Sequence, residues 1–185
     1  MKNNKLTYYI FVEELNEKTI KNIIKLKKQR LKINIIILEK NFFIIVKFAK
    51  KERIPFFIVD NIKFAIKYNA QGVFLTNKYK APKNNIKETT KLEVIGSVHN
   101  QHEYYLKKKQ NCNTIMLSPI FYNKKYSPNK ILGVIKFNLI TLNWKNNICA
   151  LGGINSKNLR LINLTKSKSV GIKSLVTNWQ KKTHP

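Results

Sequence analysis

The chain has 185 residues and carries 36 basic against nine acidic side chains, a formal net charge of +27. Apolar residues make up 43% and charged residues 24%, proportions that exclude a fibre and a disordered chain. No apolar run is long enough to cross a bilayer, no cleavable export signal is evident, and Cys112 and Cys149 lack metal or redox spacing. We therefore expect a single domain over residues 1–185 in the cytoplasm, with reduced thiols and no membrane partner.

The positive charge comes from lysine rather than arginine. Only Arg30, Arg53 and Arg160 are arginines, and lysine, asparagine and isoleucine together fill 82 positions. These three residue types share AT-rich codons, so genome composition accounts for the excess. The lysines are scattered and form no arginine–aromatic platform for bases, so no specific nucleic-acid partner is expected. A polyanion-binding protein with salt-sensitive affinity is kept as an alternative interpretation.

Short apolar runs alternate with amphipathic segments. In chain order they predict a strand at 6–12, a helix at 17–30, a strand at 33–38, a helix at 43–53, a strand at 55–59, a helix at 61–68, strands at 72–75 and 93–97, a helix at 101–110, a strand at 114–117, a helix at 134–142, a strand at 147–151, a helix at 156–164 with Ser156 as N-cap, and a strand at 170–176. Eight strands alternating with helices predict a parallel α/β protein, and eight is the number that closes a (β/α)₈ TIM barrel. Because the chain is short for that fold, the helices must be clipped; a doubly wound sheet is the alternative.

In such a barrel the carboxyl ends of the strands converge on one mouth, where the chemistry lies. The polar candidates at these ends are Lys40, Asp60, Lys78, Ser97, His99, Lys124, Lys125, Gly152 and Gly153. Asp60, the only aspartate, is either a Mg²⁺ ligand or the N-cap of the helix that follows it. The Gly152-Gly153 pair either faces an anion at a helix N-terminus or makes a tight turn. His99 is an acid or base at the mouth, or a hydrogen-bonded structural histidine.

Three other features are expected to be structural. Cys149 lies within a predicted strand and should fill the core. His102 and the run Lys107-Lys108-Lys109 should lie on solvated faces of the helix at 101–110.

The motifs together resemble the thiamine-phosphate synthase and thiazole tautomerase family. Four segments carry the resemblance: Cys149 to Asn155, similar to A-x-G-G-I; Ser118-Pro119-Ile120-Phe121 with Leu132-Gly133, similar to G-P-[IV]-F…L-G; Ser97 to Asn100, similar to S-x-H-[NS]; and Asp60 to Ala65 with Gly72 to Leu75, similar to N-D…A…G-V-H-L.

This resemblance implies a transferase of thiamine biosynthesis that joins a pyrimidine methyl diphosphate to a thiazole phosphate and releases diphosphate, with Mg²⁺ as cofactor. It implies small phosphorylated substrates as partners and allows a homodimer. Mapped onto this chain, the catalytic residues would be Lys40, Ser97, Lys124 and Lys125; the phosphate would be bound by Gly152, Gly153, Lys40 and Lys78; and Asp60 would bind the metal.

The chain also departs from the family pattern. The Q-x-R-x-K diphosphate grip falls on Ile36, Leu38 and Lys40, the N-D pair on Val59 and Asp60, the second acidic metal ligand near Lys78, the T-x-[ST]-K run on residues 123–126, the serine after the last strand near Val176, and the tautomerase histidine on Pro119. Two interpretations follow: a synthase in which lysines replace part of the site, or a barrel that binds a phosphorylated ligand without catalysis.

Overall fold

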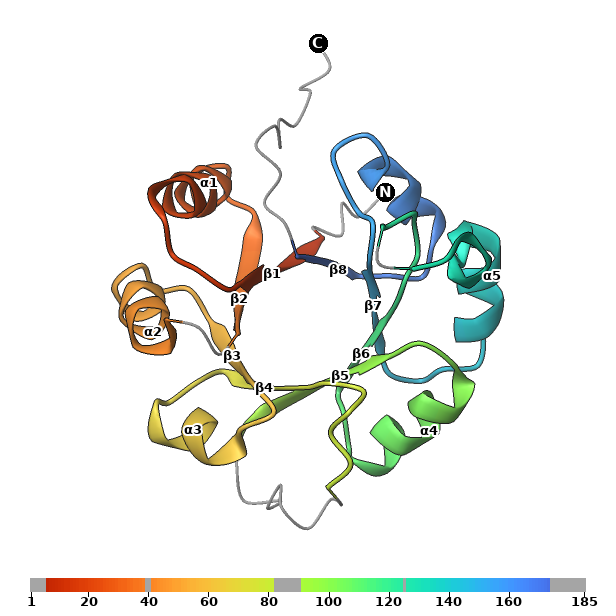
Figure 1. Ribbon diagram of the computed structural model, residues 1–185, viewed down its shortest axis with the longest axis horizontal. Coiled ribbons are helices and arrows are strands. Elements are labelled where there is room, and N and C mark those ends of the chain that lie inside the picture. Colours follow the sequence, from red (N-terminus) through yellow and green to blue (C-terminus); the bar gives the residue numbers. More distant parts are fainter. Residues whose placement is uncertain (1–5, 39–40, 82–90, 125, 174–185) are drawn as a thin grey trace.

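The structure, a computed structural model, describes residues 6–38, 41–81, 91–124 and 126–173. Eight parallel strands pair in chain order, and the last pairs with the first, so the sheet closes into a barrel ringed by helices (Figure 1). The expected small (β/α)₈ barrel is therefore confirmed, and the doubly wound alternative is wrong.

The strands are short, four to six residues each: β1 (Thr7–Val12), β2 (Lys32–Ile37), β3 (Phe56–Val59), β4 (Gly72–Leu75), β5 (Glu93–Val98), β6 (Thr114–Leu117), β7 (Asn147–Leu151) and β8 (Ser169–Ile172). The α-helices are α1 (Glu17–Lys28), α2 (Phe42–Lys51), α3 (Ile62–Lys67), α4 (Gln101–Lys109) and α5 (Gly133–Thr141). Two 3₁₀ segments are η2 (Pro128–Lys130) and η3 (Leu159–Leu164). Within these described elements no helix is both long and apolar enough to cross a membrane.

The segment between β7 and β8 differs from expectation. An α-helix with Ser156 as its N-cap was expected there, but only the 3₁₀ turns of η3 form, and Asn158 precedes them without a side-chain cap. The Asn155 side chain accepts instead from the backbone N–H groups of Lys157 and Asn158 at 2.9 and 3.3 Å. Asparagine side chains that bond to nearby backbone compete with helix formation in this way.

Two apolar clusters result from the alternation of side chains along each strand. One lies between sheet and helices, and the other fills the barrel interior with Tyr9, Phe11, Ile36, Phe57, Phe74, Ile95, Met116 and Cys149. Phe11 and Phe74 meet edge to face across the interior, with ring centroids 5.3 Å apart. The barrel is thus a packed core rather than a pore, and polar chemistry is left to its rim.

The turns that lead from helix to strand explain how a barrel fits into this length. After α1 to α4 the chain turns at Arg30, Arg53, Asn69 and Asn111, each with positive φ. In each turn the next residue bonds back to the carbonyl five residues earlier, as Leu31 does to Leu26 and Ile54 to Ala49. This is the Schellman pattern, which satisfies the last helical carbonyls within two or three residues.

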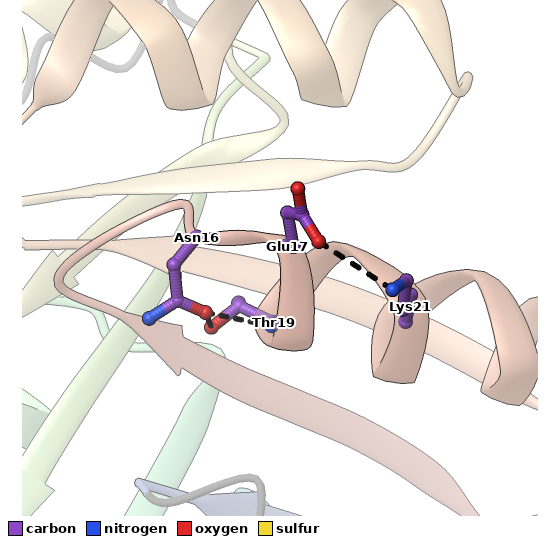
Figure 2. A network of polar contacts seen from close by, with 4 residues as sticks. All are labelled: Asn16, Glu17, Thr19 and Lys21. Atoms are coloured by element: carbon purple, nitrogen blue, oxygen red, sulfur yellow. Dashed lines mark hydrogen bonds and ion pairs between the residues drawn. The ribbon is translucent and has the colours of Figure 1, made fainter.

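The amino end of helix α1 is stabilised by side chains close to it in the sequence. The Asn16 side chain accepts from the Thr19 backbone N–H at 2.9 Å and from its hydroxyl at 3.0 Å, and Glu17 lies 3.5 Å from Lys21 one turn on (Figure 2). An N-cap of this kind contributes about 1 kcal/mol, whereas the exposed ion pair contributes a few tenths.

Gly96 on β5 is required by the packing of α4 against the barrel. A methyl group at this position would lie 2.7 Å from Cys112 Sγ and 2.9 Å from Lys107 Cδ. We expect Gly96→Ala to lower the free energy of unfolding by about 1–3 kcal/mol, measured by urea denaturation.

Cys112→Ala provides the control for this prediction. Because it removes the sulfur that meets the added methyl group, Gly96→Ala/Cys112→Ala should lose less stability than the two single variants summed. Strict additivity would show that the close approach at Gly96 does not limit packing there.

Candidate active site

The floor of the barrel mouth is apolar. Leu38, Val59 and Leu151 follow the interior residues of their strands and pack on the interior cluster. Ile36, one layer below Leu38, is completely buried. The family resemblance placed two polar positions of the diphosphate grip on β2 and directly after it, and in this chain apolar side chains that pack on the interior occupy both.

A cavity of about 560 Å³ opens above this floor on the β1 to β4 side. It is lined by Glu13, Leu38, Val59, Asp60, Thr76, Asn77 and Lys78. The structure thus brings two of the sequence-predicted residues together, because Asp60 follows β3 and Lys78 follows β4. Among the described residues, the cavity combines an apolar floor with one cation and two carboxylates.

Asp60 braces the ends of β3 and β4. Its Oδ1 accepts from the Thr76 backbone N–H at 2.8 Å and its Oδ2 accepts from the Thr76 hydroxyl at 2.6 Å. The N-cap of α3 is Asn61, whose side chain accepts from the Phe64 backbone N–H at 2.9 Å. The N-cap interpretation of Asp60 is therefore wrong, and both of its carboxylate oxygens are already engaged.

The residues around Asp60 do not fit a resident Mg²⁺ ion. Within the described ranges no three His, Cys, Asp or Glu side chains come together as a metal site. The family's second acidic metal ligand falls near Lys78 in this chain, and Lys78 is a cation that lines the same cavity. Mg²⁺ needs several oxygen ligands near octahedral geometry, and a neighbouring ammonium group opposes its binding.

The loop that carries Thr76 and Lys78 is anchored by a buried lysine on α4. Lys107 is 1% exposed, and its Nζ donates to the Tyr79 carbonyl at 3.1 Å and to the Gln110 side chain at 2.9 Å. Gln110 in turn donates to the carbonyls of Tyr79 and Ala81 at 3.2 and 2.8 Å. The expectation that Lys107 is solvated is therefore wrong, although Lys108, Lys109 and His102 are exposed as expected.

Burial has the expected electrostatic consequences for this region and for the thiols. Loss of hydration lowers the pKa of Lys107 below the usual lysine value. Burial raises the pKa of both Cys112 and Cys149 to about 12, so both thiols stay protonated and unreactive near neutral pH. Cys149 is the core residue that the sequence predicted.

His99 lies at the β5 and β6 ends of the mouth. Its Nδ1 is 2.9 Å from the Ser118 carbonyl and 3.1 Å from the Ser118 hydroxyl. Because a carbonyl only accepts, Nδ1 carries the ring proton in this arrangement, and Nε2 is left as the acceptor. The Glu103 carboxylate accepts from the His99 backbone N–H at 2.8 Å and so fixes the backbone at this position.

The Gly152-Gly153 loop follows β7 and packs against the loop after β6. Both glycines have positive φ, 91° and 72°. A methyl group on Gly152 would meet Pro119, and one on Gly153 would overlap the carbonyl oxygens of Phe121 and Tyr122. The close backbone approach therefore explains both glycines, and no α-helix follows them to supply a dipole for an anion.

The remaining sequence-predicted residues lie apart from this cavity or outside the described part of the chain. Ser97 is buried at the end of β5, and Lys124 is exposed in the loop after β6. Lys40 and Lys125 lie outside the described residues. Glu13, Glu103 and Lys107 were not among the candidates for this site. Glu13 follows β1 directly, so the strand-end rule applied to the first strand would have found it.

Comparison with known proteins finds the family that the sequence motifs resemble. A family model described as thiamine monophosphate synthase matches residues 18–175. The thiamine-phosphate synthase of Prochlorococcus marinus is 34% identical over 119 residues, which are 64% of this chain and 33% of that protein. The chain thus spans about a third of the length of this curated relative.

Two solved structures share the fold. Thiamine phosphate pyrophosphorylase from Pyrococcus furiosus has a TM-score of 0.72 at 19% identity, over 95% of this chain and 88% of the other. The Bacteroides thetaiotaomicron protein of the same name has a TM-score of 0.58 at 15% identity, over 91% and 82%. At these identities the likeness shows the barrel alone.

The buried ammonium group of Lys107 predicts a pH dependence of stability. The pKa of Lys107 is lowered in the folded state and ordinary in the unfolded state, so between the two values the unfolded chain binds more protons. The unfolding free energy of the wild type, relative to Lys107→Met, should therefore rise as pH increases toward the usual lysine pKa of about 10.4. Urea denaturation of both proteins from pH 7 to 10 measures this difference.

Lys108→Met is the matched control, because this neighbouring lysine is exposed. Its stability difference from the wild type should stay flat over the same pH range. If the difference in unfolding free energy between the wild type and Lys107→Met also stays constant from pH 7 to 10, burial of the charged ammonium group is contradicted.

Proposed function

The chain belongs to the thiamine monophosphate synthase family, and from this we propose that it joins a pyrimidine methyl diphosphate to a thiazole phosphate. The lone pair of the thiazole ring nitrogen attacks the methylene carbon. The bond from that carbon to the diphosphate oxygen breaks, and diphosphate leaves with the electron pair. No proton moves and no covalent bond to the protein forms.

The observation that supports this proposal best is the cavity above Leu38 and Val59. An apolar floor at strand ends suits a heteroaromatic ring, and Lys78 on its wall suits a phosphate group. Cavities of this kind, mostly apolar with a few convergent polar groups, are typical of small-molecule sites. The binding of the thiazole phosphate by Gly152 and Gly153 stays a prediction, because the space beside both glycines is filled by the loop that carries Pro119, Phe121 and Tyr122.

Charge on the leaving diphosphate is the main barrier in this reaction, so fixed cations would do most of the catalysis. Lys78 and Lys124 are the described candidates, and the roles of Lys40, Lys125 and Ser97 stay predictions. A lysine is a point charge and holds diphosphate with less geometric precision than a bidentate arginine. The need for Mg²⁺ that the family resemblance implies stays a prediction, which the residues around Asp60 do not support and the assay below tests.

A barrel that binds a phosphorylated ligand without turnover is the second candidate. Two observations favour it: Ile36 and Leu38 replace polar grip positions with apolar packing, and Asp60 is engaged by Thr76. A polyanion-binding role has less support, because exposed lysines occur on all five α-helices and are not gathered on one of them. The homodimer expected from the resemblance also stays a prediction.

Thiamine phosphate formation tests the proposal directly. The protein is incubated with both substrates, with and without Mg²⁺, and product is followed after oxidation to its fluorescent derivative. We expect turnover by the wild type, with kcat/KM about a hundredfold lower in Lys78→Ala, because one cation that stabilises the leaving group is lost.

Lys80→Ala is the matched control, since this exposed lysine lies on the same loop but does not line the cavity. It should retain wild-type activity. If no product forms while calorimetry detects binding of the pyrimidine methyl diphosphate, the synthase proposal fails and the binding barrel replaces it.

A further inference from the structure

Glu13 reaches the cavity because it directly follows β1. Tyr9 and Phe11 point into the barrel interior, and the side-chain period of two along a strand brings residue 13 to the same side, at the mouth. Glu13 lines the cavity together with Asp60 and Lys78. It is the carboxylate that the β1 end contributes to this site.

Glu13 lies beside the apolar floor rather than beside the cation. The register of β1 and β2 pairs Val12 with Ile37, and the Leu38 backbone N–H donates to the Val12 carbonyl at 3.0 Å. Lys78 follows β4, three strands further around the barrel than β1. The cavity therefore runs from a carboxylate at β1, over Leu38 and Val59, to a cation after β4.

The two carboxylates of the cavity differ in what already engages them. Asp60 accepts two hydrogen bonds from Thr76. Over the described part of the chain, no side-chain hydrogen bond or ion pair is found for Glu13. Its acceptor capacity is therefore available to a ligand, and a carboxylate accepts only from donors such as an amino group.

We propose that the pyrimidine substrate of this site carries an exocyclic amino group and that Glu13 recognises it by accepting a hydrogen bond from that group, while the ring lies on Leu38 and Val59. This inference rests on the proposed function and adds a residue from β1 to it. Glu13 and Asp60 both repel the diphosphate, and Lys78 is the described cation of the cavity that attracts it. The hydrogen bond to Glu13 would fix which edge of the ring faces the end of β1.

Direct binding tests the assignment without depending on turnover. Calorimetry measures the affinity of the wild type and Glu13→Ala for three probes: the aminopyrimidine methyl diphosphate, the same compound without its amino group, and inorganic diphosphate. Glu13→Ala should bind the first probe roughly tenfold or more weakly, because a charge-assisted hydrogen bond is lost. It should bind inorganic diphosphate as well as or better than the wild type, because a like charge is removed.

The probe without the amino group isolates the proposed contact. The wild type should bind this probe more weakly than the aminopyrimidine probe. Glu13→Ala should bind the two probes equally well, because it cannot form the hydrogen bond with either of them. Glu14→Ala is the matched control: Glu14 is also exposed and is adjacent in sequence, but it does not line the cavity. Its affinities for all three probes should equal those of the wild type.

The outcomes separate this inference from the proposed function. If the wild type binds the aminopyrimidine probe and Glu13→Ala binds it equally well, the role of Glu13 is overturned while the synthase proposal stands. Equal discrimination against the probe without the amino group by both proteins would overturn it too. If the wild type binds none of the probes, the proposed substrate site and the inference fail together.

Discussion

Hydrogen bonding between β8 and β1 closes the sheet, and closure decides where each strand side chain can go. Thr7 to Ile10 pair with Ser169 to Ile172, so no edge of the sheet is left open. One set of alternate side chains must then fill a single interior, and the other must face the helices. Because the strands are only four to six residues long, the mouth begins about one layer above Phe11, Ile36 and Phe74.

This shallow geometry determines the character of the site. Leu38 and Val59 serve both as the upper surface of the interior packing and as the floor of the cavity. A polar side chain at Ile36 would be buried among aromatic and aliphatic neighbours without water, which is costly unless it finds a partner. Ile36 packs in the core instead, so the polar groups that the described residues offer in this cavity lie at its rim, among them Glu13, Asp60, Thr76 and Lys78.

The rim is held from outside the barrel as well. Asp60 joins the ends of β3 and β4 through Thr76, and Lys107 on α4 holds the Tyr79 carbonyl three residues further along. Bonds from buried or partly buried donors to backbone carbonyls restrict a loop more than exposed contacts do, because water does not compete for them. The position of Lys78 in the cavity therefore depends on a helix that does not line it.

Most of the fold could be predicted from the chain, and the limits of the prediction follow from particular residues. The predicted strands at 72–75 and 114–117 match β4 and β6 without a shift, because fully buried strands show as short, largely apolar segments. The predicted strand at 147–151 also matches β7, whose three central residues are buried. The prediction of an α-helix at 156–164 was wrong. The periodicity of that segment did not reveal the hydrogen bonds that the Asn155 side chain accepts from the backbone of its own loop.

Local sequence by itself determined the number and order of the strands, the position of Cys149 in the core, and the gathering of strand-end residues at one mouth, since all three depend on periodicity and on the geometry of parallel strands. Only the tertiary structure decided that Lys107 is buried, that Asp60 is occupied by Thr76, and that Glu13 shares a cavity with Lys78. Each of these depends on residues at least 16 positions apart or on different strands. Contacts of that kind depend on how segments distant in the chain pack together, which no local pattern encodes.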